Sequence, residues 1–298
     1  MGIYDKNGDE LFLCYDKNGN PLEVAYDKNG DPIWYRGPVT LRVMSFNIRW
    51  GSYSNAIRRI TDAIYTEEHP DIIGFQEVIR GSDTAWPTVQ SGGGSYPTYL
   101  ANNFGVPYSA HGTEAYNKTA IASKYAISDF ESVRYSIQDS EPEWREYTKC
   151  HITVRGKTIL WYNTHLGLGP EYRAVMRDEL LADIEEAMET EDYIIVTGDF
   201  NVQVASDETT DSEFYAEQVQ PFIDIGLTLA NWQDFGMIPT YTNTTGSGTW
   251  KCLDNIMVNA NITIDEAWAD MVKVTDNQEN QTIDHVPFVA DLILRDVT

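Results

Sequence analysis

The sequence predicts an α/β protein in which mixed β-sheets are covered by helices, preceded by a short β-hairpin repeat at the N-terminus. From residue 38 onward, short apolar strands alternate with longer helical or irregular segments, which is typical of a layered α/β domain. Two of these strands, HITV and TILWYNTHL, flank the turn Arg155-Gly156-Lys157 and are expected to form an antiparallel hairpin. Strands joined through helices and strands joined by a tight turn together predict mixed sheets.

Residues 1–37 contain the repeat. The pentapeptide YDKNG begins at Tyr4, Tyr15 and Tyr26, and apolar and polar residues alternate between the copies. Asn-Gly favours a tight hairpin turn, because both central residues of such a turn need positive φ. We expect a β-meander that is too small to be stable alone and that docks on the main domain or attaches the protein to a larger assembly through residues 1–36. Repeats of this kind resemble those on proteins of phage particles and gut bacteria, which suggests a phage or bacterial source.

Residues 38–298 are predicted to form one main domain. Strands are expected at residues 40–48 and 71–78, with a helix over residues 54–70 between them. A second helix is expected over residues 171–190, where apolar side chains recur at helical spacing: Val175, Leu180, Leu181, Ile184 and Met188. The run YIIVTGDFN at residues 193–201 predicts a strand that is buried on both faces.

The net charge is the unusual feature of the composition. The chain has 46 Asp and Glu but 21 Lys and Arg, which gives a formal net charge of −25. A protein that binds nucleic acid along a long footprint normally carries a basic face, because neutralised phosphates supply most of the affinity. A nucleic-acid ligand would therefore be contacted through few phosphates or with recruited cations. The alternative interpretation is that the acidity only keeps the protein soluble.

Other classes of protein are disfavoured by the sequence. Apolar runs stay far below the roughly 18 residues that predict a membrane-spanning helix. The N-terminus, MGIYDKNGDE, lacks the basic and then apolar order of a secretory signal, so we expect a soluble protein whose compartment is open. Three scattered cysteines do not predict a disulfide framework or a zinc site.

Polar side chains stand at the ends of several predicted strands. A sheet fixes the backbone at such ends, while the adjoining loops leave room for a ligand. For any one residue, a turn cap or a hydrogen-bonded structural histidine would be the simpler interpretation. Together, however, these endings indicate one site. The residues are Asn47, Glu77, His165, Asp199, Asn201, Asp254, Asp284 and His285.

The residue types at these ends restrict the chemistry. Carboxylates and amides without a thiolate suit a hard cation such as Mg²⁺ or Mn²⁺, with Ca²⁺ as a further candidate. Two histidines add proton transfer near neutral pH. The sequence has no G-x-S-x-G elbow, no P-loop lysine motif and no H-E-x-x-H motif. These observations predict metal-assisted hydrolysis of a phosphate ester.

Six motifs resemble those of the endonuclease/exonuclease/phosphatase superfamily typified by deoxyribonuclease I. They occur in the family's order, SFNIR, GFQEV, NTHLG, GDFN, LDNIMV and IDHVP, between about Leu41 and Leu294. The resemblance implies a four-layer α/β sandwich with two mixed β-sheets and a site at their shared edge. It also implies that Glu77 ligates a divalent metal, with Asn47 nearby and Asp284 contributing.

The resemblance implies catalytic roles for the remaining residues. Asp199 would orient or deprotonate the attacking water, and Asn201 would hold the water or the phosphate. His285 would pair with Asp254, and His165 would face it across the scissile phosphate. Which histidine is the acid stays open.

The resemblance also implies that four residues contact the substrate. Arg49 and Arg145 would bind phosphate oxygens, which suits bidentate guanidinium geometry, although an edge-strand salt bridge is an equal alternative for Arg145. Tyr116 and Asn117 stand where the family often contacts substrate.

Two positions distinguish branches of the superfamily. The abasic-site repair enzymes have a tyrosine in place of His165 and an aspartate in place of Arg49, so this chain resembles deoxyribonuclease I at both. Lys118 lies near the position of the glutamate that supports the first histidine of deoxyribonuclease I. The partner of His165 is therefore open.

The leading prediction is a divalent-metal-dependent phosphodiesterase, a nuclease with little sequence preference that acts on nucleic acid, with DNA favoured over RNA. One alternative keeps this chemistry on a phospholipid, as in sphingomyelinases and phospholipase C-like enzymes, or on a small phosphate ester. An exposed apolar loop would favour the lipid, whereas a groove lined by Arg49, Arg145 and Arg173 would favour nucleic acid. The alternative of another class is a non-catalytic attachment or structural protein that retains a nuclease fold.

Overall fold

The computed structural model describes most of the main domain and part of the N-terminal region. The predicted helix over residues 54–70 lies outside the described residues except for residues 68–70, and so do the first two YDKNG copies. The described residues are 24–26, 32–35, 37–49, 68–78, 96–113, 118–139, 143–202, 218–232, 234, 236–241, 251–269 and 284–297.

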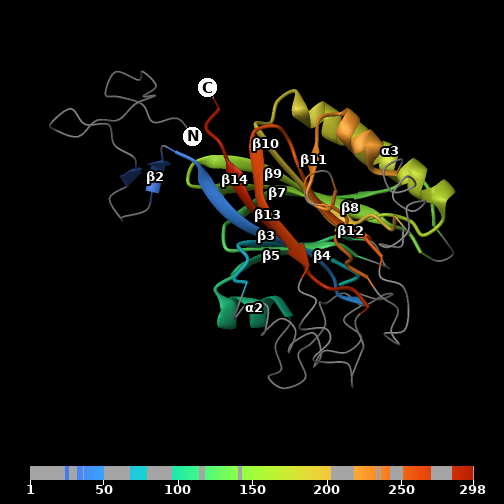
Figure 1. The fold of residues 1–298 in the computed structure, drawn as a ribbon. Helices are drawn as coiled ribbons and strands as arrows, with labels where there is room; N and C mark the ends of the chain where they lie inside the picture. The colour runs from blue at the N-terminus through green and yellow to red at the C-terminus, as the bar shows by residue number, and fades with distance from the viewer. Residues whose placement is uncertain are drawn as a thin grey trace.

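Two six-stranded sheets form the centre of the domain (Figure 1). The first consists of β7 (Ile127–Arg134), β8 (Glu146–Val154), β9 (Lys157–His165), β10 (Tyr193–Asp199), β11 (Thr228–Leu229) and β12 (Asp254–Val258). The second consists of β3 (Val39–Asn47), β4 (Ile72–Gln76), β5 (Tyr108–His111), β6 (Ala120–Ser123), β13 (Ile262–Ala269) and β14 (Phe288–Leu294).

Both sheets are mixed, as predicted. Their orders are β11-β12-β10-β9-β8-β7 and β13-β14-β3-β4-β6-β5. The pairs β9–β10 and β3–β4 are parallel, and the other pairs are antiparallel. The predicted hairpin of β8 and β9 is confirmed, and its turn residues Arg155 and Gly156 have φ of 49° and 84°. These positive φ values match the twist of the flanking strands.

Helix α3 (Pro170–Met188) covers the outer face of the first sheet. Met176, Leu180 and Ile184 recur every four residues and form its inward stripe. The predicted helix is confirmed, although Val175, one of the apolar residues that indicated it, lies outside this stripe and is 38% exposed.

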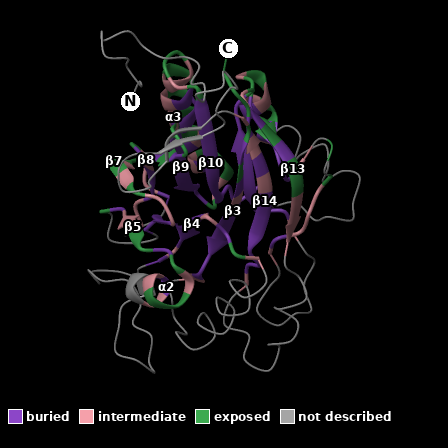
Figure 2. Ribbon diagram, turned by 90° about the vertical axis from the view of Figure 1, so that its left-hand side faces the viewer, coloured by how far each residue is buried: buried purple, intermediate pink, exposed green. Residues whose placement is uncertain are grey.

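The apolar clusters define four layers. Leu41 and Val43 of the second sheet pack against Trp161 and Ile195 of the first, which gives a core between the sheets. On the far side of the second sheet, Leu100 of α2 (Tyr96–Phe104) joins a separate cluster. The order is therefore α3, first sheet, second sheet, α2, with both sheets largely buried (Figure 2). This arrangement confirms the predicted α/β sandwich.

Two short strands precede the two six-stranded sheets in the sequence and form a separate sheet. β1 (Val24–Tyr26) and β2 (Pro32–Tyr35) pair antiparallel on either side of the third YDKNG copy, where a hairpin was expected. The intervening residues 27–31 lie outside the described part of the chain. Of the described helices, none has the length and apolar character needed to cross a membrane.

Candidate active site

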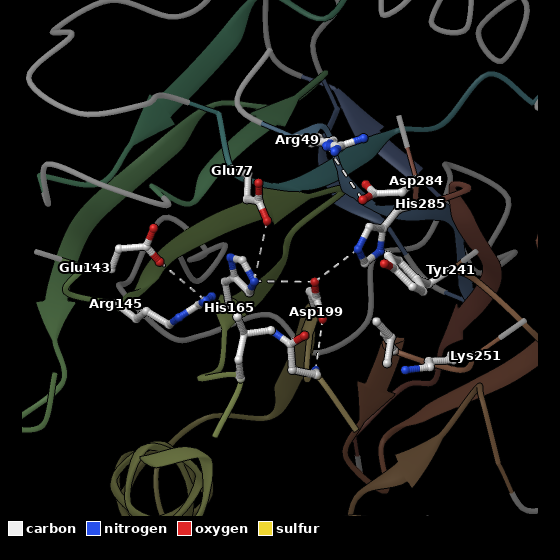
Figure 3. A pocket seen from close by; sticks show the side chains of 13 residues that line it. Arg49, Glu77, Glu143, Arg145, His165, Asp199, Tyr241, Lys251, Asp284 and His285 are labelled. Carbon is white, nitrogen blue, oxygen red and sulfur yellow. Dashed lines mark hydrogen bonds and ion pairs between the residues drawn. The ribbon is translucent and has the colours of Figure 1, made fainter. Parts of the chain in front are cut away.

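The predicted strand ends meet at one edge of the sandwich. Asp199 ends β10 and lies in register with His165 of β9 on one side and Asp254 of β12 on the other. From the second sheet, Asn47 ends β3 and Glu77 directly follows β4. The Asn47 amide nitrogen donates to Asp199 Oδ2 over 2.9 Å, so the two sheets touch here. The pocket above this contact has a volume of about 310 Å³ (Figure 3).

Asp199 is the central carboxylate of the pocket. Its Oδ1 accepts the backbone N–H of Asn201 at 2.9 Å. Its Oδ2 lies 3.4 Å from Nε2 of His165 and 3.5 Å from Nε2 of His285, so a histidine stands on each side (Figure 3). Burial raises the pKa of Asp199 to about 6, against the opposing charge of His285. A carboxylate with this pKa can accept a proton from water near neutral pH.

His285 is held as an imidazolium. Its Nδ1 lies 2.8 Å from Asp254 Oδ2, and Thr240 Oγ1 accepts the backbone N–H of Asp254 at 3.0 Å, which holds the backbone of this residue. Burial lowers the pKa of His285, but the charges of Asp254 and Asp199 outweigh burial and raise it to about 10. The ring can therefore donate a proton into the pocket.

His165 has the opposite protonation state. Burial lowers its pKa well below the ordinary value, and the charge of Arg145 acts in the same direction. Its Nδ1 has no hydrogen-bond partner among the residues that the structure describes. Of the two histidines, His285 is therefore the better candidate for the acid.

Glu77 is the best-placed candidate for a metal ligand. Its side chain is 16% exposed, and its Oε1 accepts the Asn47 amide at 3.2 Å. Burial raises the pKa of Glu77 to about 7, so its charged form is costly unless a cation offsets it. Asp284 lines the same pocket and lies 3.6 Å from Arg49. These carboxylate oxygens fit a hard cation such as Mg²⁺ or Mn²⁺.

Asn47 organises these carboxylates. Its amide nitrogen donates to both Glu77 and Asp199, and its Oδ1 accepts the backbone N–H of Arg49 at 2.9 Å. The oxygen keeps one lone pair for a cation, but the amide as a whole is used to hold its neighbours.

A second set of donor atoms lies close together. Oxygen and nitrogen atoms of Asp199, Asp254 and His285 all lie within 4.8 Å of one another. This set suits a metal less well, because Asp254 and His285 are hydrogen-bonded to each other and a protonated ring has no lone pair to offer. We interpret it as a proton-transfer group.

Three site residues have left-handed backbone conformations. Arg49, Glu77 and Asn201 have φ of 45°, 54° and 51°, and each follows closely after the end of a strand. Such values are uncommon for residues other than glycine, and they cluster at functional sites. The amide nitrogen of Asn201 also donates to the Leu166 carbonyl at 2.8 Å, which orients its side chain.

Three basic side chains line the pocket within the described chain: Arg49, Arg145 and Lys251. Arg145 is 2% exposed. Its Nε donates to Asp139 at 3.0 Å, while its Nη1 has no hydrogen-bond partner among the described residues. The salt bridge is therefore present, and it fixes a guanidinium that lines the pocket, whereas binding of a phosphate by Arg145 stays a prediction.

Arg49 and Arg145 line the pocket, whereas Arg173, the third residue considered for a groove that would favour nucleic acid, does not. Its Nη1 is buried and donates to the carbonyls of Leu168 and Asn201 at 3.1 and 2.6 Å, where it joins the loops after β9 and β10. Tyr116 and Asn117 lie outside the described residues. The sequence analysis missed Lys251 because it precedes Asp254 in an irregular segment.

A polar bridge behind the pocket was also missed. Gln76 donates to Asn163 Oδ1 at 2.7 Å, and Asn163 donates to the Phe75 carbonyl at 2.8 Å, so the two sheets are hydrogen-bonded through their cores. Gly74 allows this approach, because a Cβ there would lie 2.2 Å from Thr197 Oγ1. Polar residues inside otherwise apolar strands, as in GFQE and WYNTH, could have indicated this bridge.

The comparisons with known proteins place the chain in a family. A sequence model of the endonuclease/exonuclease/phosphatase family matches residues 44–276, and the chain belongs to this family. The family name covers enzymes that hydrolyse phosphate esters. A comparison with curated proteins found no match.

Solved structures of low sequence identity share the fold. The endonuclease/exonuclease/phosphatase from Beutenbergia cavernae is 20% identical, with a TM-score of 0.61 over 86% of this chain and 72% of that one. The 3'-5' exonuclease NExo from Neisseria meningitidis is 17% identical, with a TM-score of 0.60 over 84% of this chain and 98% of that one. D. rerio TDP2, in complex with a single-strand DNA product, is 15% identical, with a TM-score of 0.59 over 85% of this chain and 98% of that one.

Proposed function

We propose that the protein is a divalent-cation-dependent phosphodiesterase that hydrolyses nucleic acid, with DNA as its principal substrate. The observation that carries the proposal is the position of Asp199 Oδ2, 3.4 Å from one histidine ring and 3.5 Å from another, beside the half-buried carboxylate of Glu77. A base, proton donors and a candidate cation ligand thus surround one small volume, as hydrolysis of a phosphate ester requires.

The protonation state of each residue determines its role in the proposed reaction. Asp199 accepts a proton from the attacking water, and His285 donates a proton to the leaving oxygen while Asp254 keeps its ring oriented. The neutral ring of His165 and the amide of Asn201 hydrogen-bond to the phosphate or to the water. A cation held by Glu77 and Asp284 would offset the negative charge that develops on the phosphate.

The chemistry of the pocket lining supports nucleic acid over a lipid. Arg49, Arg145 and Lys251 supply cations for phosphate oxygens. Among the described residues, Leu168 is the one exposed large apolar side chain at the pocket, and Trp232 packs partly buried against the cluster beneath α3. A lipid substrate would need a larger apolar surface. A protein of net charge −25 is not expected to bind nucleic acid along a long footprint. Three basic side chains would contact only a few phosphates, which is compatible with this charge.

Two structural neighbours lend further support to DNA. NExo is described as a 3'-5' exonuclease, and TDP2 was solved with a single-strand DNA product. A non-catalytic role is less well supported, because every polar position of the family motifs is filled and the side chains converge.

The proposal is tested on four substrates in parallel: supercoiled plasmid DNA, single-stranded RNA, sphingomyelin vesicles and p-nitrophenyl phosphate. Wild type, Asp199→Ala and the control Asp178→Ala, which changes an exposed carboxylate of α3, are each assayed with Mg²⁺, Mn²⁺ or EDTA. We expect cation-dependent nicking of the plasmid by wild type and the control, and at least a hundredfold lower rate for Asp199→Ala. Hydrolysis of sphingomyelin or p-nitrophenyl phosphate alone would contradict the proposal, and so would no turnover by wild type.

A further inference from the structure

Lys251 holds a fixed position in the pocket. Its backbone N–H donates to the Tyr241 carbonyl at 2.8 Å, and its own carbonyl accepts the N–H groups of Thr240 and Tyr241 at 2.8 and 2.9 Å. Tyr241 also forms a β-bridge with His285, and its ring stands edge-on to the imidazole with centroids 4.9 Å apart. The backbone of Lys251 is therefore tied to the proposed acid.

The charge environment separates Lys251 from the two arginines. Arg49 lies 3.6 Å from Asp284, and Arg145 lies 3.0 Å from Asp139. In contrast, no carboxylate of the described residues lies within 4.0 Å of the Lys251 ammonium group. A lysine without such a partner, in a pocket of a chain with net charge −25, favours an anion from the substrate.

The basic residues also stand on different sides of the reacting centre. In Figure 3, Arg145 lies beside His165, whereas Lys251 lies below Tyr241 on the same side of Asp199 as His285. If the scissile phosphate lies between the two histidines and binds Arg145, Lys251 is available to bind a second anionic group of the substrate. In a nucleic-acid strand, the next anionic group along the chain is the neighbouring phosphate.

We propose that Lys251 binds a second phosphate of the strand, adjacent to the scissile phosphate on the His285 side. The inference rests on the proposed nuclease function and adds to it a preference for substrates with at least two phosphates. It makes Lys251 a substrate-positioning residue that selects polynucleotides over small esters with a single phosphate.

The test compares three forms of a thymidine dinucleotide: with its single internal phosphodiester, with an added 3'-phosphate, and with an added 5'-phosphate. Wild type should hydrolyse one of the two longer forms with a kcat/KM about tenfold above that of the shortest form, as expected for one charged contact. In Lys251→Gln this ratio should fall to about 1, and in Lys251→Arg it should be kept. Lys124→Gln, which removes the same charge beside Asp71 and outside the pocket, should keep the ratio of wild type.

Salt dependence on a single-stranded oligonucleotide gives a second readout. The slope of log kcat/KM against log salt concentration should become shallower by about 0.7 in Lys251→Gln, because one phosphate contact is lost. Equal ratios and slopes in wild type and Lys251→Gln would overturn the inference while leaving the nuclease function intact. Failure of wild type to cleave any of these substrates or plasmid DNA would overturn both.

Discussion

The side-chain amide of Asn47 donates a hydrogen bond to Asp199 Oδ2 over 2.9 Å, although the two residues are 152 positions apart and belong to different sheets. The same amide nitrogen donates to Glu77 at 3.2 Å. One side chain thus sets the separation between the proposed base and the proposed cation ligand. The alignment of the two sheets therefore determines the geometry of the site.

Asn47→Ala should lower kcat/KM by about tenfold to a hundredfold, because a hydrogen bond to a charged group contributes about 1.5–3 kcal/mol. The measurement is the initial rate of plasmid nicking, with circular dichroism to verify folding. Asn103→Ala is the matched control, since Asn103 donates to a backbone carbonyl on the exposed face of α2. If a folded Asn47→Ala protein is as active as wild type, Asn47 does not organise the site.

Because the pKa of Glu77 is raised on folding, we expect the stability of the protein to depend on pH and on the bound cation. Burial raises the pKa of Glu77 to about 7 in the folded protein, from about 4.3 in the unfolded chain. The folded state therefore binds the proton more tightly, and stability falls as the pH rises between these values. In EDTA at pH 8, Glu77→Gln should be more stable than wild type by about 1–3 kcal/mol, and this difference should vanish near pH 4.

Urea denaturation at pH 4, 6 and 8 measures this difference. Added Mg²⁺ or Mn²⁺ should stabilise wild type at pH 8 and have little effect on Glu77→Gln, because a ligand stabilises the state that binds it. A pH-independent difference, or equal stabilisation of both proteins by the cation, would show that Glu77 is not the ligand.

The hydrogen-bonded pair of Asp254 and His285 indicates that His285 is the general acid. The carboxylates of Asp254 and Asp199 outweigh burial and raise the pKa of His285 to about 10, so the ring should remain protonated from pH 6 to 9 in an NMR titration. Asp254→Asn removes one of these charges, so the ring should titrate at lower pH, and kcat should fall by about 10²–10⁴.

The same pair has a signature in stability. A raised folded-state pKa of His285 stabilises the protein fully below the unfolded value of about 6.5, and this contribution is lost as the pH rises through about 10. The part of the stability difference between wild type and Asp254→Asn that comes from His285 should therefore shrink as the pH rises from the lowered pKa of the variant to about 10. An unchanged titration of His285 in the variant would exclude the proposed pairing.

The sequence was most informative where local pattern determines structure. The run YIIVTGDFN predicts β10 with Asp199 at its end. A strand buried on both faces is a continuous apolar run, so its end is marked by the first charged residue. The same reasoning predicts that Asn47, Glu77 and His165 lie at or next to strand ends, as they do. The family motifs then predicted that these ends share one edge.

Features that depend on packing between distant segments could not be predicted. Asn163 and Gln76 meet across the sheets from positions 87 residues apart, and no local pattern encodes that distance. Arg173 was considered as a third arginine of a substrate groove, but its guanidinium donates to backbone carbonyls instead. The apolar residues that indicated α3 included Val175, which is exposed, and left out Met176, which faces inward. Helical spacing alone does not fix how a helix is rotated against its sheet.

The most direct test of the site is the cation dependence of plasmid nicking by wild type, Glu77→Gln and Glu143→Gln, each titrated with Mn²⁺ from an EDTA-treated preparation. Glu143 lines the same pocket but lies 4.0 Å from Arg145, so its variant controls for loss of one pocket carboxylate. We predict saturable activation of wild type, a half-saturating Mn²⁺ concentration at least tenfold higher in Glu77→Gln, and an unchanged value in Glu143→Gln. Undiminished hydrolysis in EDTA, or the same Mn²⁺ dependence in wild type and Glu77→Gln, would contradict the account.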